Sequence, residues 1–296
     1  MLADKILRTL IVFGMLLGAA FTQEGRSVTQ PVSFTYVDII APNATSTRAQ
    51  GINNKREIVG GFVSDDYDGF VVQNGDFTTY DPYYVTWVSG VNSSGELAGY
   101  YYPGFGGDQA FVSSQGVIST LTYPGATSTI AWGINDAGDV VGQYLSSDSG
   151  SQGFLYSNGE FTTIDFPDAT LTVAEGVNDS GDIVGYYMPS EGGYNSFVYK
   201  DGAFRQLVVP GCVESGAFGI NELGDVVGYC RTGTATYGYL YKDGAFSFLS
   251  DPNAESNGIL GTYAFGVNDF DDVVGYYTSR GSYYEYGFLA IPAGKR

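Results

Sequence analysis

Short apolar runs alternate with polar turns along almost the whole chain, and no stretch after residue 22 has the pattern of a helix. From 128 to 167, four apolar runs follow one another, at 129–134, 139–144, 153–156 and 160–166. Asn135-Asp136-Ala137-Gly138 and Ser157-Asn158-Gly159 separate runs as tight turns, because Asn and Gly enter left-handed backbone easily. This segment therefore predicts four short antiparallel strands.

A twelve-residue phrase returns six times in the chain. It begins with Gly, then Ile or Val, then Asn and two variable residues. Next usually comes Gly followed by Asp or Glu, and an apolar pair, a further Gly and usually two Tyr complete it. The copies begin at Gly51, Gly90, Gly133, Gly176, Gly219 and Gly266. Their spacings of 39, 43, 43, 43 and 47 residues match the period of one propeller blade. The predicted fold is all-β, a six-bladed β-propeller of four-stranded antiparallel blades.

The two ends of the repeat array complement each other. The sixth repeat stops after its third strand, at 287–291, whereas an extra strand at 34–40 precedes the first repeat and aligns with the fourth strand at 161–166. We therefore expect the N-terminal strand to complete the last blade, which leaves no open edge between the first and last blades. This arrangement favours a closed ring over an open solenoid.

The N-terminus resembles a secretory signal peptide over residues 1–22, with a basic start, an apolar run and small residues before a polar segment. The alternative is an anchoring helix that stays attached. Residues 23–32 are read as a linker, 33–291 as the propeller and 292–296 as a C-terminal tail. We expect a secreted or periplasmic monomer with no membrane span after signal cleavage.

The chain is strongly acidic, with a formal net charge of −19. Such a surface repels phosphate backbones, so we expect no nucleic-acid partner. Turns such as Asn135, Asp136 and Asp139 bring oxygen atoms close together, but they are shorter than a calcium loop. We interpret them as turn-forming residues and predict no metal site and no cofactor, with calcium as the minor alternative.

Two cysteines lie at the fifth repeat, Cys212 just before its first strand and Cys230 at the end of its second. In a hairpin that turns at Glu222-Leu223, Cys230 lies opposite about Ser215, so Cys212 comes within reach after a small bend. A disulfide is expected in an exported protein, and two buried free thiols are the alternative.

Through phrases such as 133–142 and 176–185, residues 33–291 resemble the bacterial extracellular HAF repeat proteins, which are named for a His-Ala-Phe motif near the third strand. This chain has no His, and Ala110-Phe111, Gly153-Phe154 or Ser196-Phe197 stands at the signature position. The resemblance implies an exported repeat protein and implies no particular reaction.

The absence of His excludes His-dependent nucleophilic catalysis and the usual zinc and iron sites. Phosphate-binding loop motifs are also missing. Enzymatic chemistry would then depend on carboxylates, Tyr or a bound hard cation, and glycan cleavage is the credible reaction.

The residues just before each Gly of the phrase are expected to line the inner strands near the channel mouth. These positions hold both tryptophans of the chain, together with charged and aromatic residues. The predicted ligand-binding residues are Arg48, Trp87, Trp132, Glu175 and Tyr263. Aromatic faces and charges suit a sugar or an acidic ligand, although packing between blades also uses large aromatics.

Three classes of function remain open. The leading hypothesis is a secreted binding or cell-surface interaction module without catalytic residues, with a polysaccharide or cell-surface glycan as ligand. The alternative is a carboxylate-dependent glycan-cleaving enzyme that uses Glu175 with Asp65, Asp66 or Asp68. A structural protein that self-associates through tyrosine-rich faces is the third.

Overall fold

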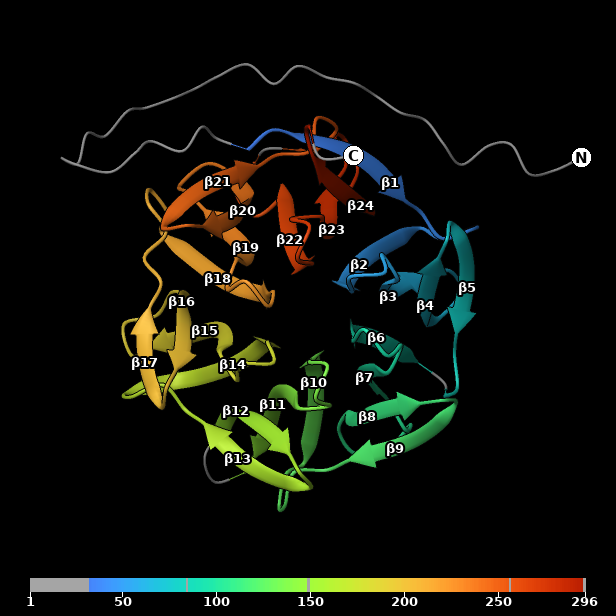
Figure 1. Ribbon diagram of the computed structural model, residues 1–296, viewed down its shortest axis with the longest axis vertical. Coiled ribbons are helices and arrows are strands. Elements are labelled where there is room, and N and C mark those ends of the chain that lie inside the picture. Colours follow the sequence, from blue (N-terminus) through green and yellow to red (C-terminus); the bar gives the residue numbers. More distant parts are fainter. Residues whose placement is uncertain (1–31, 84, 148–149, 256, 295–296) are drawn as a thin grey trace, which may run out of the picture.

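The computed structural model describes residues 32–294 except 84, 148–149 and 256. Regular structure in this part of the chain consists of 24 strands in six four-stranded antiparallel sheets, which stand as blades around a central axis (Figure 1). The predicted six-bladed β-propeller is confirmed. The predicted leader at 1–22, and all of the linker at 23–32 except its last residue, lie outside the described residues.

The blades are numbered from the first one that the chain completes. Blade 1 contains β2 (Ser46–Ile52), β3 (Ile58–Val63), β4 (Tyr67–Gln73) and β5 (Asp76–Tyr80). Blade 2 contains β6 (Thr86–Val91), β7 (Leu97–Tyr101), β8 (Gln109–Ser114) and β9 (Val117–Leu121). Blade 3 contains β10 (Ser128–Ile134), β11 (Val140–Ser146), β12 (Gly150–Ser157) and β13 (Glu160–Ile164).

The second half of the ring repeats this order. Blade 4 contains β14 (Ala169–Val177), β15 (Ile183–Pro189), β16 (Asn195–Lys200) and β17 (Ala203–Gln206). Blade 5 contains β18 (Glu214–Ile220), β19 (Val226–Arg231), β20 (Thr236–Lys242) and β21 (Ala245–Leu249). Blade 6 contains β22 (Thr262–Val267), β23 (Val273–Thr278), β24 (Glu285–Pro292) and β1 (Phe34–Ile39).

The core lies between neighbouring blades. Each third strand contributes one fully buried aromatic residue: Phe70, Phe111, Phe154, Phe197, Tyr239 and Phe288. The last Gly of the phrase makes room for this ring. At Gly142, an added Cβ would lie 1.9 Å from the Ile130 carbonyl oxygen and 2.8 Å from Phe154 Cε1. The phrase therefore encodes close backbone approach as well as turns.

β1 closes the ring by pairing with β24, from Phe34 opposite Pro292 to Ile39 opposite Gly287. Figure 1 shows this N-terminal strand, in blue, beside the red strands of blade 6. The hydroxyl of Tyr277 donates a hydrogen bond of 3.2 Å to Asp38 on β1. The predicted closure is confirmed, because β1 is the fourth strand of blade 6.

Ion pairs flank this composite blade on both sides. Arg56 and Asp271 replace Gly in their copies of the phrase and adopt left-handed backbone, with φ of 60° and 62°. Arg56 Nε lies 2.6 Å from Asp272, which joins blade 1 to blade 6, and Lys242 Nζ lies 2.6 Å from Asp271, which joins blade 5 to blade 6. Backbone strain at the two non-Gly residues is thus accompanied by charge pairing across the seams.

Cys212 and Cys230 form a disulfide with their Cα atoms 5.4 Å apart. The pairing of β18 with β19 places Cys230 opposite Ser215, as the hairpin register predicts. The bond ties the loop before β18 to the end of β19.

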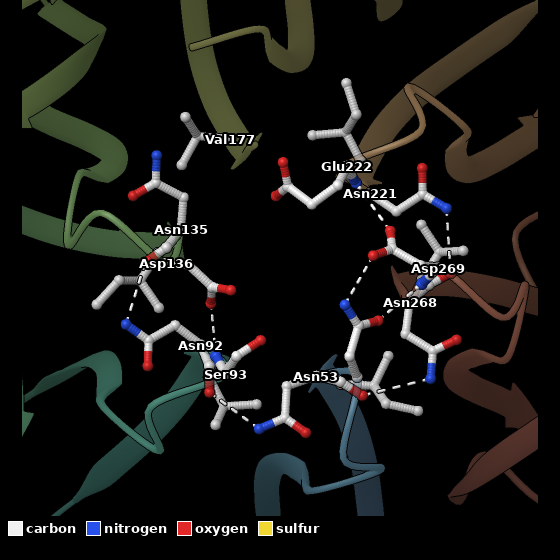
Figure 2. A pocket seen from close by; sticks show the side chains of 16 residues that line it. Asn53, Asn92, Ser93, Asn135, Asp136, Val177, Asn221, Glu222, Asn268 and Asp269 are labelled. Carbon is white, nitrogen blue, oxygen red and sulfur yellow. Dashed lines mark hydrogen bonds between the residues drawn. The ribbon is translucent and has the colours of Figure 1, made fainter. Parts of the chain in front are cut away.

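Six asparagines of the phrase form a closed ring around one end of the central channel, and we call it the asparagine ring. Each Nδ2 donates to the backbone carbonyl of the corresponding Asn in the next blade, over 2.9 to 3.3 Å. Figure 2 shows Asn53, Asn92, Asn135, Asn221 and Asn268 of this set. Its members are Asn53, Asn92, Asn135, Asn178, Asn221 and Asn268. Because every blade donates to one neighbour and accepts from the other, the ring fixes the blades to each other at this end.

Candidate ligand-binding site

A cavity of about 580 Å³ opens toward the start of β2, away from the asparagine ring at its end. Such a volume falls in the range of small-molecule sites. Blades 6, 1, 2 and 3 supply the walls: Thr45, Ser46, Arg48, Gln50, Gly61, Val63, Tyr67, Val85, Trp87, Tyr100, Trp132, Tyr283, Tyr284 and Glu285. The cavity therefore lies off-centre, over one half of the ring.

Arg48 crosses from blade 1 to blade 6 at the wall of the cavity. Its Nε and Nη2 donate to the two carboxylate oxygens of Glu285, over 2.5 and 2.6 Å. Burial alone would lower the pKa of Arg48, but the hydrogen bonds to Glu285 raise it above its ordinary value. The guanidinium also lies 4.8 Å from the ring centre of Tyr276 and 5.9 Å from that of Trp87. Its charge is thus balanced within the cavity wall.

Trp87 forms part of the cavity wall, next to a position where blade 1 has Gly instead of an aromatic residue. Gly61 stands where most copies of the phrase have the first Tyr, and an added Cβ there would lie 2.5 Å from the Trp87 ring. The indole Nε1 donates to Gln50 Oε1, and the Tyr67 ring centre lies 6.5 Å away. Gly61 therefore makes room for the indole, and Gln50 fixes its orientation.

Trp132 forms another part of the wall and contacts Tyr100 edge to face, with ring centres 5.4 Å apart. Its Nε1 is buried and has no hydrogen-bond partner among the described residues. Three tyrosines surround the entrance with largely exposed rings, Tyr67 at 50%, Tyr283 at 85% and Tyr284 at 50%. The cavity thus combines stacking faces with a free hydrogen-bond donor.

Glu175, another of the predicted ligand-binding residues, is not among the residues that line the cavity. It is 8% exposed, and burial raises the pKa of its carboxyl to about 8. Burial also raises the pKa of Tyr186, and the carboxyl of Glu175 raises it further. Burial therefore favours the protonated, neutral form of this carboxyl at pH 7.

Tyr263 also lies outside the cavity wall. Its ring packs 5.4 Å from Tyr229 and 5.0 Å from Tyr276, and its hydroxyl donates to the Ile259 carbonyl over 2.7 Å. Packing between blades accounts for the position of this ring, which is the alternative interpretation given above for the inner aromatic residues. The other half of the channel is filled by such rings.

Three of the five predicted residues, Arg48, Trp87 and Trp132, thus meet in one cavity. The five predicted residues did not include several others that line the wall: Gln50, Tyr67, Tyr100 and Glu285. Tyr100 belongs to the repeated phrase, and the predicted ligand-binding residues include no tyrosine of that phrase. No sequence signal links Glu285 to Arg48, because the two residues are 237 positions apart.

The acids proposed for catalysis are not brought to the cavity. Asp65, Asp66 and Asp68 belong to the segment around the start of β4, and among the described wall residues Glu285 is the single carboxylate. Because Arg48 occupies both of its oxygens, the wall does not present the pair of acids that glycan hydrolysis requires.

Carboxylates at the other end of the channel act as acceptors between blades. Asp136 accepts the Ser93 N–H over 2.6 Å, and Asp269 accepts that of Glu222 (Figure 2). Asp179 accepts the N–H of Asp136 in the same way. Within the described residues, no group of three or more His, Cys, Asp or Glu is arranged to hold a metal ion. Over the same part of the chain, no helix has the length and apolar character to cross a membrane.

No protein-family profile matches the sequence, and no curated protein matches it. Solved structures with the same fold include TolB from Acinetobacter baumannii, at a TM-score of 0.53 and 15% identity over 68% of this chain and 52% of that one. A gluconolactonase from Xanthomonas campestris has a TM-score of 0.52 and 11% identity over 89% and 96% of the two chains. Aleuria aurantia lectin in complex with Fucalpha1-6GlcNAc has a TM-score of 0.51 and 15% identity over 85% and 97%. At identities this low, the structural likeness shows the shared propeller fold alone. That fold serves both binding proteins and enzymes.

Proposed function

We propose that this protein is a secreted binding propeller and that its cavity binds a neutral saccharide. The cavity with Trp87 and Trp132 in its walls carries the proposal, because sugar rings stack their C–H faces on indole and phenol rings. The exposed rings of Tyr283 and Tyr284 extend the aromatic surface to the entrance. The lectin among the similar structures supports a binding role for the fold. Export, and membership of the HAF repeat family, are part of the same proposal and rest on the repeated phrase and the N-terminal pattern.

The charges in the cavity favour a neutral ligand over an acidic one. Arg48 is the cationic side chain among the described wall residues, and Glu285 balances it through two hydrogen bonds. The chain as a whole carries a net charge of −19. A uronate would therefore have to displace Glu285 and approach an anionic protein.

Retention on polysaccharides tests this proposal, with laminarin, xylan and mannan as neutral probes and polygalacturonate and alginate as acidic ones. The chain contains two Trp residues and both line the cavity, so tryptophan fluorescence reports directly on occupancy. We expect retention by at least one neutral polymer, a change in fluorescence and no release of reducing or unsaturated ends. Release of such ends would support the glycan-cleaving enzyme instead.

Variants locate the binding site. Trp132→Phe and Tyr67→Ala should each weaken retention about tenfold, since stacking contacts contribute on the order of 1 kcal/mol or more. Phe248→Ala on β21 removes an aromatic ring that is 46% exposed and far from the cavity wall, and it serves as the matched control. Retention that is unchanged in the two cavity variants, or equal for the acidic polymers, would overturn the proposal.

A further inference from the structure

Arg48 on β2 and Glu285 at the start of β24 form the charged part of the cavity wall. Among the described wall residues, Arg48 is the single cation and Glu285 the single carboxylate. Their side chains are 37% and 21% exposed, so a molecule in the cavity can reach both of them. The two groups neutralise each other, and the described wall therefore carries no net charge while they stay paired.

The guanidinium of Arg48 presents to Glu285 the edge with which arginines bind carboxylates. Nε and Nη2 donate to different oxygens of the carboxylate, over 2.5 and 2.6 Å, which is the two-point geometry of a strong arginine–carboxylate pair. A uronate is a sugar that carries the same chemical group. Glu285 thus occupies, from within the protein, the position that the carboxylate of an acidic sugar would take on Arg48.

Aromatic rings hold Arg48 in place independently of Glu285. The guanidinium carbon lies 4.8 Å from the ring centre of Tyr276 and 5.9 Å from that of Trp87. Both contacts are attractive because the faces of aromatic rings are negative. Removal of the Glu285 carboxylate would therefore leave an arginine of fixed position, with two N–H donors turned toward the space that the carboxylate had filled.

We propose that Glu285 is the specificity-determining residue of the cavity: it closes the carboxylate-binding edge of Arg48, so that neutral saccharides bind and acidic ones are rejected. This inference rests on the proposed function and names the residue that sets the ligand class. A uronate in the wild-type cavity places two carboxylates beside one guanidinium, and one of the two loses its partner. Glu285 acts as the repulsive element that distinguishes the two classes of ligand.

Glu285→Ala tests the proposal by removing the carboxylate. Oligogalacturonate and neutral oligosaccharides from laminarin, xylan and mannan are titrated into the wild type and the variant. Tryptophan fluorescence is the readout, because both Trp residues line the cavity. The affinity for oligogalacturonate should rise by about tenfold or more, since a two-point, charge-assisted contact becomes available to the ligand. No rise, or an equal rise for the neutral oligosaccharides, would overturn the proposal.

Glu214→Ala is the matched control. Glu214 pairs with Arg231 in blade 5, with side chains 24% and 28% exposed, and neither residue lines the cavity. The control removes the same charge from the protein, so a gain in both variants would reflect net charge alone and contradict the proposal. The double variant Arg48→Met/Glu285→Ala should lose the gain, because no guanidinium remains. Glu285→Gln keeps the size of the side chain and should show a smaller gain if Glu285→Ala unfolds.

The outcomes separate this proposal from the proposed function. If the wild type binds a neutral oligosaccharide but Glu285→Ala gains nothing with oligogalacturonate, saccharide binding stands and the role of Glu285 is wrong. If the wild type binds none of the neutral probes but Glu285→Ala gains binding of oligogalacturonate that Arg48→Met abolishes, the proposed function fails, whereas closure of Arg48 by Glu285 stands. Equal binding of oligogalacturonate by the wild type and Glu285→Ala contradicts both.

Discussion

Asn92 provides the sharpest test of the asparagine ring. The side chain is 3% exposed and makes four hydrogen bonds. Nδ2 donates to the Asn135 carbonyl over 3.1 Å and to Glu96 Oε2 over 2.8 Å. Oδ1 accepts the backbone N–H groups of Ser94 and Glu96, over 3.0 and 2.9 Å. One half of the amide thus joins two blades, and the other half holds the turn of its own blade.

Asn92→Ala removes all four bonds. At about 1 kcal/mol of net stability for each bond, the free energy of unfolding should fall by about 4 kcal/mol. A loss of this size lowers the Tm by about 10 °C in a domain of this class. Urea unfolding followed by tryptophan fluorescence, together with calorimetry, measures both quantities.

Asn92→Asp separates the ring from the turn. The carboxylate still accepts the N–H groups of the turn, but an oxygen replaces the donor and faces the Asn135 carbonyl and the Glu96 carboxylate. We therefore expect a loss as large as that of Asn92→Ala. Ser94→Ala, an exposed change in the same turn, is the control and should stay within about 0.5 kcal/mol of the wild type. If Asn92→Asp unfolds like the wild type, the bonds between blades contribute nothing and the reasoning is refuted.

Three further predictions follow from the closure, the disulfide and the buried acid. Deletion of 33–40 removes β1 and exposes the edge of β24, so the Tm should fall by more than 10 °C, and an unchanged Tm would contradict ring closure. Cys212→Ser opens the disulfide across 18 positions and should lower the free energy of unfolding by about 3 kcal/mol in oxidising buffer, with no difference from the wild type once both proteins are reduced. Between pH 4.5 and about 8 the folded protein keeps the proton of Glu175 that the unfolded chain has lost, so stability should fall as pH rises across this window. Urea titrations should show that Glu175→Gln removes this fall, and equal slopes in both proteins would disprove the buried, neutral carboxyl.

Blade number, strand order and ring closure could be predicted from the sequence because local features determine them. Turn residues such as Asn135 and Gly138 act within a few positions, and the alternation of apolar runs specifies the strands between them. The disulfide hairpin register followed from the same local pairing. The unpaired strand at 34–40 then required a partner, and the end of the chain supplied one.

The site could be predicted only in part. The prediction took the residues just before each first Gly of the phrase, and this selected Arg48, Trp87 and Trp132, which line the cavity. The same criterion also selected Tyr263, whose ring is packed, and Glu175, which lies deeper in the channel. Position in the repeat does not reveal which of six equivalent residues faces open space, since that depends on the size of the side chains across the channel.

By itself, the sequence determined the blades, their number and the closure, because hydrogen-bonded hairpins and turn preferences operate over short distances along the chain. Only the tertiary structure decided where the propeller has a cavity and what charge it presents. Gly61 makes room for the Trp87 indole where most other blades have Tyr, and Glu285 balances Arg48 from 237 positions away. Both effects arise between blades, where packing and electrostatics depend on residues that closure of the ring alone brings together.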